Sequence, residues 1–253
     1  MGRGAAVAAL ALVALAGGAP VARAATGPAV PILMYHHVAA APAGVGAPAL
    51  WVSPGAFASQ VGALRAAGYR AVTLGRVWDA WHGGARLPRR PVVLTFDDGY
   101  ADQVAAALPV LRRARWPGVL NLALDLLPAM GGVPAVRQLL GAGWELDSHS
   151  VSHAELRTLG RTRLRTEVAG SRARIRSLFG VTPRFFCYPF GHFDGAVAGA
   201  VRRAGYLGAT TTRAAFATPR TPFFLPRVQV SRGESASDLL RRLRALRLRA
   251  GRQ

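Results

Sequence analysis

The stretch PVVLTFDDGY, residues 91–100, is an apolar run that ends directly in two adjacent carboxylates, Asp97 and Asp98. A short apolar run followed by turn residues is typical of a buried strand. Further along, HSVSH at residues 149–153 places His149 and His153 four residues apart, again after a predicted strand. One carboxylate and two histidines can hold a divalent metal and leave positions open for water and substrate. The spare carboxylate can accept a proton from that water, so the two blocks predict a metal-assisted hydrolase.

Each block also has a simpler interpretation. Asp-Asp-Gly is by itself typical of a turn, and two histidines four residues apart are as often a surface pair as a ligand pair. The chain has only six histidines, however, and both blocks fall where predicted strands end. We therefore favour the joint interpretation as a metal site.

Four blocks of the sequence carry a family resemblance. TFDDGY and HSVSH resemble the first two motifs of the polysaccharide deacetylase family, also known as the NodB-homology or carbohydrate esterase family 4 enzymes. FFCYPFG at residues 185–191 resembles the third motif, and PILMYHHV at residues 31–38 resembles the opening strand of a subgroup that includes poly-N-acetylglucosamine deacetylases. The resemblance implies an enzyme that removes N-acetyl groups from polysaccharides or oligosaccharides containing N-acetylglucosamine.

The resemblance also implies roles for the residues of the first two motifs. Asp98, His149 and His153 become the metal ligands, and Asp97 becomes the general base. The implied cofactor is a divalent ion, with zinc as the default, although mixed oxygen and nitrogen ligands also accept cobalt, nickel or iron.

The third motif and the opening strand supply the remaining expected roles. The backbone N–H of Phe190 is expected to stabilise the oxyanion, with Tyr188 and Gly191 as neighbouring substrate-binding residues. The departing amine needs a proton, and the chain has no histidine after His192 in the place where the family commonly has its donor. The subgroup with the early Tyr-His block implies His36 instead, and His37 less so because neighbours on a strand face opposite sides.

The sequence departs from the family pattern in two places. Cys187 aligns with an arginine that usually holds the catalytic base, and Arg184, three residues earlier, is an open alternative. The acidic residue that usually orients the proton donor has no obvious counterpart. His192 and Asp194 could line the cleft or belong to a polar loop. Tryptophan side chains could stack on sugar rings, although core packing is their default: Trp51, Trp78 and Trp81.

Predicted strands alternate with predicted helices along the chain. The strands are expected at 32–37, 69–74, 92–96, 118–124, 145–148, 185–188, 207–211 and 228–230, and the helices at 54–67, 101–114, 133–142, 161–178, 195–204 and 235–249. This alternation predicts a parallel β/α architecture, and the resemblance implies a distorted (β/α) barrel of about seven strands. The candidate residues lie at predicted strand ends, where the chemistry of such barrels collects.

The N-terminus is typical of a signal peptide over residues 1–24. Arg3 precedes the apolar stretch Ala5–Ala16, and Ala-Arg-Ala at 22–24 resembles a cleavage site. Residues 25–253 are then expected to form a single catalytic domain, with the motif core at about 89–230. No other segment approaches the ~18 apolar residues of a membrane span. We expect an exported monomer without a transmembrane anchor, in the periplasm, on the cell surface or outside the cell.

All 32 basic residues are arginine, and the formal net charge is +20, or +18 without Arg3 and Arg23. Such a charge favours loose association with an anionic cell envelope. No nucleic-acid-binding motif accompanies it. The single cysteine excludes an internal disulfide. The last predicted helix has leucines on one face, and we favour packing on the barrel over a position on a membrane.

Two other functions are compatible with the same sequence features. The site could hydrolyse another amide or an O-acetyl ester, or the chain could be a degenerate barrel that binds glycan without turning it over. The intact set of Asp97, Asp98, His149 and His153 argues against the second alternative, because a binding module has no need of a spare base.

Overall fold

The computed structural model describes residues 1–2, 25–84 and 86–250. The expected signal peptide lies, apart from its first two residues, outside this part of the chain, so its cleavage after residue 24 stays a prediction.

Parallel strands form the centre of the molecule, and each of the eight predicted strands is present in the described residues. Their bounds are β1 Ile32–Tyr35, β2 Arg70–Ala71, β3 Pro91–Asp98, β4 Val119–Leu122, β5 Glu145–Ser148, β6 Phe185–Cys187, β7 Gly208–Thr210 and β8 Val228–Gln229. Seven of them follow the order β7-β6-β5-β4-β3-β1-β8, and β2 pairs with the start of β3. The distorted (β/α) barrel is confirmed.

The segment before β8 brings the two ends of the sheet together. Leu225 bridges to Thr210 of β7, while Val228 pairs with Leu33 of β1. The Arg227 N–H also donates to the carbonyl of Arg213, 3.0 Å away. One short stretch of chain therefore contacts both edges of the sheet and closes the barrel.

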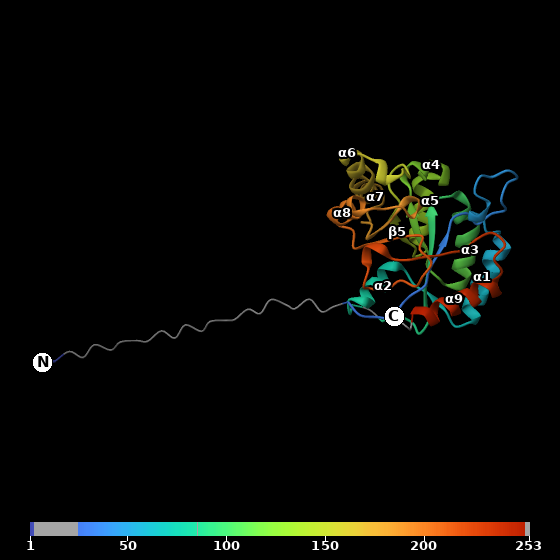
Figure 1. The fold of residues 1–253 in the computed structure, drawn as a ribbon, viewed down its shortest axis with the longest axis horizontal. Helices are drawn as coiled ribbons and strands as arrows, with labels where there is room; N and C mark the ends of the chain where they lie inside the picture. The colour runs from blue at the N-terminus through green and yellow to red at the C-terminus, as the bar shows by residue number, and fades with distance from the viewer. Residues whose placement is uncertain (3–24, 85, 251–253) are drawn as a thin grey trace.

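Helices cover the outside of the strands (Figure 1). Their bounds are α1 Pro54–Ala66, α2 Leu74–Trp81, α3 Leu108–Ala114, α4 Leu127–Met130, α5 Gly132–Gly141, α6 Arg161–Arg165, α7 Ser171–Phe179, α8 Gly195–Arg203 and α9 Ala236–Ala250. Ser53 caps the N-terminus of α1, because its Oγ accepts the Ala56 N–H at 3.2 Å. Gly180 ends α7 with a φ of 74°, a conformation that glycine adopts without steric cost.

The structure corrects three of the predicted elements. Leu74, expected to end a strand, begins α2, because the Thr73 hydroxyl accepts the Arg76 N–H and caps a helix there. The predicted helices at 101–114 and 161–178 contain single π-helical turns, η2 Gln103–Ala107 and η5 Thr166–Gly170. Apolar periodicity does not reveal such a turn, because one inserted residue hardly changes the pattern.

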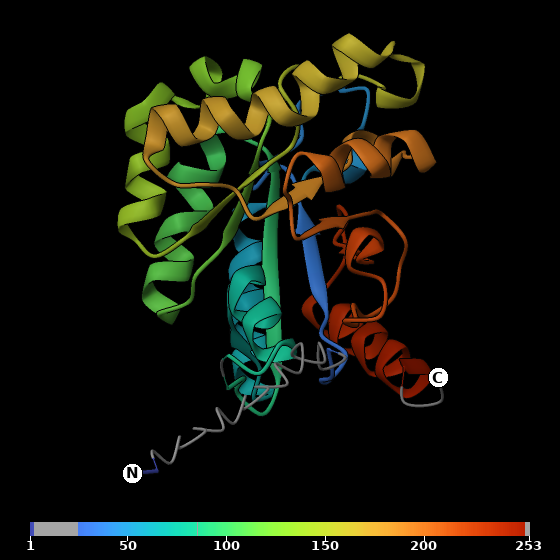
Figure 2. The ribbon, with the colours of Figure 1, turned by 90° about the vertical axis from the view of Figure 1, so that its left-hand side faces the viewer.

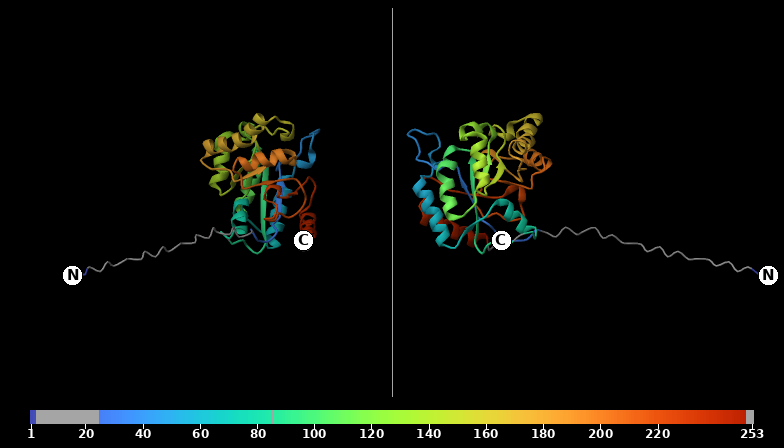
Figure 3. Two further views of the ribbon diagram at one scale, coloured as in Figure 1. Left: turned by 60° about the vertical axis from the view of Figure 1, so that its left-hand side comes forward. Right: turned by 180° about the vertical axis from the view of Figure 1, so that it is seen from behind.

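The C-terminal helix packs on the barrel, as the sequence analysis favoured. Leu239 and Leu243 are fully buried, and α9 lies against α1 (Figure 3). In the part of the chain that the structure describes, no helix combines the length and the apolarity that crossing a membrane requires.

Strand β3 is buried along its whole length, including both carboxylates at its end. Figure 2 shows the strands from the side, with α6 and α7 across one end of the barrel and α9 near the other. Because the strands are parallel, their carboxyl ends share one end of the barrel, where the residues that follow β1, β3, β5 and β6 meet.

Candidate metal centre

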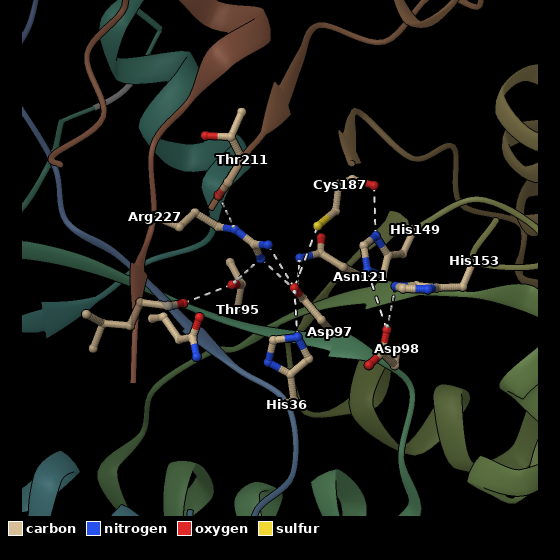
Figure 4. Close-up of polar contacts among 12 residues, drawn as sticks. His36, Thr95, Asp97, Asp98, Asn121, His149, His153, Cys187, Thr211 and Arg227 are labelled. Atoms are coloured by element: carbon tan, nitrogen blue, oxygen red, sulfur yellow. Dashed lines mark hydrogen bonds and ion pairs between the residues drawn. The ribbon is translucent and has the colours of Figure 1, made fainter. Parts of the chain in front are cut away.

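Three predicted ligands converge at the carboxyl ends of β3 and β5 (Figure 4). The Asp98 Oδ1 atom lies 3.5 Å from His149 Nε2 and 3.4 Å from His153 Nε2. Two ligands that each lie ~2.1 Å from a tetrahedral ion are about 3.4 Å apart. The separations therefore suit one shared cation.

The chemistry of this donor set also fits a cation. Asp98 Oδ1 is buried and has no hydrogen-bond partner among the described residues, and such an atom is costly unless something neutralises it. The His149 Nδ1 atom lies 2.8 Å from the carbonyl oxygen of Cys187. That carbonyl can accept only from a protonated Nδ1, so the lone pair of the neutral ring is on Nε2 and faces Asp98.

Strained backbone shapes the two loops that carry these ligands. Asp98, Ser150 and His153 all have left-handed φ angles, of 74°, 70° and 56°. Residues other than glycine rarely adopt this conformation, and it is concentrated at functional sites. The strain is thus spread over both ligand loops.

Asp97, the expected base, has a very different environment from Asp98. Its Oδ1 accepts from Asn121 Nδ2 at 2.7 Å and from Arg227 Nη1 at 2.7 Å, and its Oδ2 accepts from Arg227 Nη2 at 2.8 Å. Burial raises the pKa of the Asp97 carboxyl, but the guanidinium of Arg227 outweighs burial and holds it well below its usual range. Asp97 therefore stays ionised at neutral pH.

The arginine that the third motif lacks comes from the residue directly before β8. Arg227 is fully buried and forms the bidentate pair with Asp97, whereas Arg184 pairs with Asp79 at 2.5 Å. Arg184 precedes β6 and so lies at its opposite end from the site. Cys187 occupies the vacant place, with its Sγ donating to Asp97 Oδ2 at 3.7 Å. The alternative of Arg184 as the partner of Asp97 was wrong.

The two adjacent histidines after β1 point to different neighbours. His36 Nε2 lies 3.8 Å from Asp97 Oδ2, too far for a direct hydrogen bond. His37 instead stacks between Trp51 and Tyr100, and its Nδ1 lies 2.7 Å from Asp102 Oδ2. His36 is thus the member of the pair that faces the base.

The third-motif residues surround the site in unequal ways. Phe190 has a left-handed φ of 59°, and its half-exposed ring lies 4.5 Å from the His153 ring. The Tyr188 ring is fully buried, with its hydroxyl donating to the Phe223 carbonyl, so the structure places it in the core rather than open to a substrate.

A Cβ on Gly191 would lie 2.2 Å from Thr212 Oγ1. Glycine is required there for close packing.

The remaining polar and aromatic candidates are also placed. Asp194 accepts the Val197 N–H at 2.8 Å and caps α8, which is a structural role. His192 is exposed, with Nδ1 2.5 Å from Glu155 Oε2. Trp81 is buried in the core, and Trp78 stacks on His82.

Sequence reasoning did not find Arg227 or Asn121. Asn121 lies within β4 and Arg227 lies directly before β8, and neither residue belongs to a recognisable motif. All 32 basic residues of the chain are arginine. The residue type of Arg227 therefore did not distinguish it as the partner of Asp97. Asn121 was detectable only as a polar residue inside an apolar strand.

Replacing Arg227 with methionine is expected to destabilise the protein by about 3–5 kcal/mol, because the Asp97 carboxylate would remain buried without its cation. Urea unfolding of the metal-free protein measures this change. Arg184→Met is the matched control, and its half-exposed pair with Asp79 predicts a loss of at most about 1 kcal/mol. Equal losses in the two variants would contradict the assignment of Arg227 as the structural partner of Asp97.

Comparisons with known proteins show which family this chain resembles. The model of the polysaccharide deacetylase family matches residues 84–209. The protein YxkH of Bacillus subtilis (strain 168) is 26% identical over 210 residues, which cover 82% of this chain and 73% of the relative. The poly-beta-1,6-N-acetyl-D-glucosamine N-deacetylase of Escherichia coli (strain K12) is 24% identical over 238 residues, which cover 76% of this chain but only 35% of that relative.

A solved structure supports the fold. The Streptococcus pyogenes deacetylase PplD in complex with acetate superimposes with a TM-score of 0.78 at 22% sequence identity, covering 85% of this chain and 98% of that one. The match of residues 84–209 to the family model, together with the four sequence motifs, identifies the chain as a member of the polysaccharide deacetylase family.

Proposed function

We propose that this protein is an exported, metal-dependent hydrolase that removes N-acetyl groups from polysaccharides or oligosaccharides containing N-acetylglucosamine. One observation carries the proposal: a cation-ready set of Asp98, His149 and His153 lies beside a second carboxylate, Asp97, that arginine keeps ionised. A site that only binds glycan would not require this division between a ligand carboxylate and a base.

Asp98, His149 and His153 would hold the cofactor. A divalent cation bound there, with zinc as the default and cobalt, nickel or iron as alternatives, supplies Lewis-acid polarisation of the acetyl carbonyl and lowers the pKa of water. Histidine and carboxylate ligands suit each of these ions.

Asp97 would take the proton from the attacking water. Its pair with Arg227 keeps the accepting form present at neutral pH, but it also makes the carboxylate a weak base. A weak base passes its proton on readily. His36 Nε2 lies 3.8 Å from Asp97 Oδ2 and would receive the proton once this contact shortens to hydrogen-bond length in the substrate complex.

His36 would then deliver that proton to the departing amine nitrogen. Burial lowers the pKa of the His36 ring, and the charge of Arg227 acts in the same direction. The ring is therefore neutral before the reaction and becomes an acid only when it acquires the proton from Asp97. Its low pKa then favours release to the amine.

The oxyanion would be stabilised by the backbone N–H of Phe190. Support comes from the position of this residue, whose ring contacts the ring of His153. Phe190 lies in a left-handed turn, and preorganised backbone donors are a common source of such stabilisation.

The substrate class rests on similarity to the Escherichia coli poly-beta-1,6-N-acetyl-D-glucosamine N-deacetylase, of which this chain spans about a third. An exported enzyme would meet such polymers in the periplasm, on the cell surface or outside the cell, where its arginine-rich surface would favour an anionic envelope. The alternatives remain another amide or an O-acetyl ester as substrate, or a barrel that binds glycan without turnover.

The deciding experiment measures acetate release from chitooligosaccharides, β-1,6-linked N-acetylglucosamine oligomers and peptidoglycan fragments, with and without a chelator. We expect release from the β-1,6-linked oligomers, its loss on chelation and its recovery when zinc is added back. Glycan binding without acetate from any substrate would favour the binding barrel. Release only from acetyl esters would reassign the bond.

Asp97→Asn is expected to retain the metal and to lose about 10²–10⁴-fold in acetate release, because general-base catalysis typically contributes that much. Zinc content and kcat are measured on the same preparation. Because Asp97 also neutralises Arg227, the assay temperature is chosen below the melting transition of the variant. Full activity in this variant would reassign the base.

His36→Ala is expected to bind metal normally and to be slow on N-acetyl substrates. The variant should be less impaired on an activated acetyl ester, whose leaving group departs without a proton. The ratio of kcat/KM values on the two substrates measures this difference. An equal loss on both would indicate a structural role for His36 and would make His37 or His192 the next candidate.

A further inference from the structure

The loop between the two histidine ligands is anchored by a buried carboxylate from outside the motifs. Glu167 Oε2 accepts the N–H groups of Val151 and Ser152, each at 2.9 Å, and Oε1 accepts the Ser152 hydroxyl at 2.7 Å. The Glu167 side chain is almost fully buried. Charge-assisted hydrogen bonds of this kind are about twice as strong as neutral ones.

This loop needs an external anchor because its own backbone is strained. Ser150 and His153 both have left-handed φ angles, and each such residue costs of order 1–3 kcal/mol. Within the loop, the Ser150 Oγ accepts only the His153 N–H, at 3.0 Å. The remaining hydrogen bonds come from neighbouring segments.

The loop is held from two sides. On one side its carbonyls accept hydrogen bonds from the start of η3, Leu124–Leu126: Leu124 N–H donates to Ser150 at 3.3 Å, and Asp125 N–H donates to Val151 at 2.9 Å. On the other side its amides donate to Glu167. Loss of the carboxylate would leave the amide side of the loop without its acceptors.

Glu167 reaches the loop from the π-helical turn η5, which interrupts the helical run between α6 and α7. A π turn inserts one residue and rotates the side chains that follow it, and such turns recur at functional sites. Glu167 therefore faces the barrel end, while Arg163, one turn earlier, reaches its Oε1 at 3.5 Å from the solvent side.

We propose that Glu167 is a positioning residue of the metal site, which fixes residues 150–153 so that His149 and His153 converge with Asp98. This inference rests on the proposed function in one respect, namely that these three residues bind a cation. Glu167 touches neither the cation nor the substrate, and it acts through the loop. Glu167 belongs to none of the four motifs, and it does not stand in for any motif residue.

Glu167→Gln is the central test, because the amide keeps the shape but loses the charge and introduces a donor where the loop offers donors. Zinc affinity is measured by competition with a chromophoric chelator, and it is expected to fall about 10- to 100-fold. Hydrogen exchange of the Val151 and Ser152 amides in the metal-free protein is expected to become faster. Neither readout depends on turnover.

Two further variants sharpen the test. Arg163→Gln removes the exposed partner of Glu167 but leaves the three loop hydrogen bonds intact, so zinc affinity should change less than about threefold. Ser152→Ala removes one of the three bonds and should weaken zinc about three- to tenfold. This second variant keeps the proposal testable if Glu167→Gln fails to fold.

The outcomes separate the two proposals. A wild-type protein that binds none of zinc, cobalt, nickel and iron would overturn the proposed metal-dependent function. Wild-type zinc affinity and wild-type exchange rates in both Glu167→Gln and Ser152→Ala would overturn the positioning role alone. A purely structural role predicts a lower melting temperature in Glu167→Gln with unchanged zinc affinity below the transition, and this result would also reject the inference.

Discussion

The buried ion pair between Asp97 and Arg227 joins the closure of the barrel to its chemistry. Arg227 belongs to the segment that contacts both edges of the sheet, and its Nε donates to the Thr211 carbonyl at 3.0 Å. Its Nη1 reaches Thr95 and Asp97 of β3 at 3.0 and 2.7 Å. An unpaired charge at this depth is strongly destabilising, so closure of the barrel, which brings the guanidinium to the carboxylate, is also what makes the buried Asp97 tolerable.

Two adjacent carboxylates acquire different chemistry from their surroundings. Alternation along a strand would send neighbouring side chains to opposite faces, but the left-handed φ of Asp98 redirects its side chain toward the same end of the barrel. Asp97 is saturated by donors from Asn121 and Arg227, whereas Asp98 Oδ1 keeps no protein donor. The hydrogen bonds to Asp97 keep its carboxylate charged, and the Asp98 oxygen without a donor is suited to a cation.

The histidine loop illustrates how a strained segment is maintained by rigid neighbours. Glu167 and the start of η3 hold it from opposite sides, so the cost of two left-handed residues is met by hydrogen bonds that the loop could not make alone. The third-motif loop follows a similar rule, since Gly191 packs against Thr212 and Tyr188 is anchored in the core. In both loops the supporting contacts come from outside the recognised motif.

Local pattern in the sequence determined the elements and the motif residues. The strand predicted at 92–96 lies within β3, Pro91–Asp98, because an apolar run that ends in turn residues has few alternatives. The sequence identified the candidate ligands Asp98, His149 and His153 because they belong to two recognisable motifs. Each motif follows a predicted strand, and the carboxyl ends of parallel strands lie at the same end of a barrel. Only the tertiary structure decided which arginine serves Asp97. Arg227 lies 130 residues from Asp97 along the chain, and nothing in its local sequence distinguishes it from Arg184. The physical reason is that motif residues are specified by short-range periodicity, whereas the partner of a buried charge is selected by barrel closure.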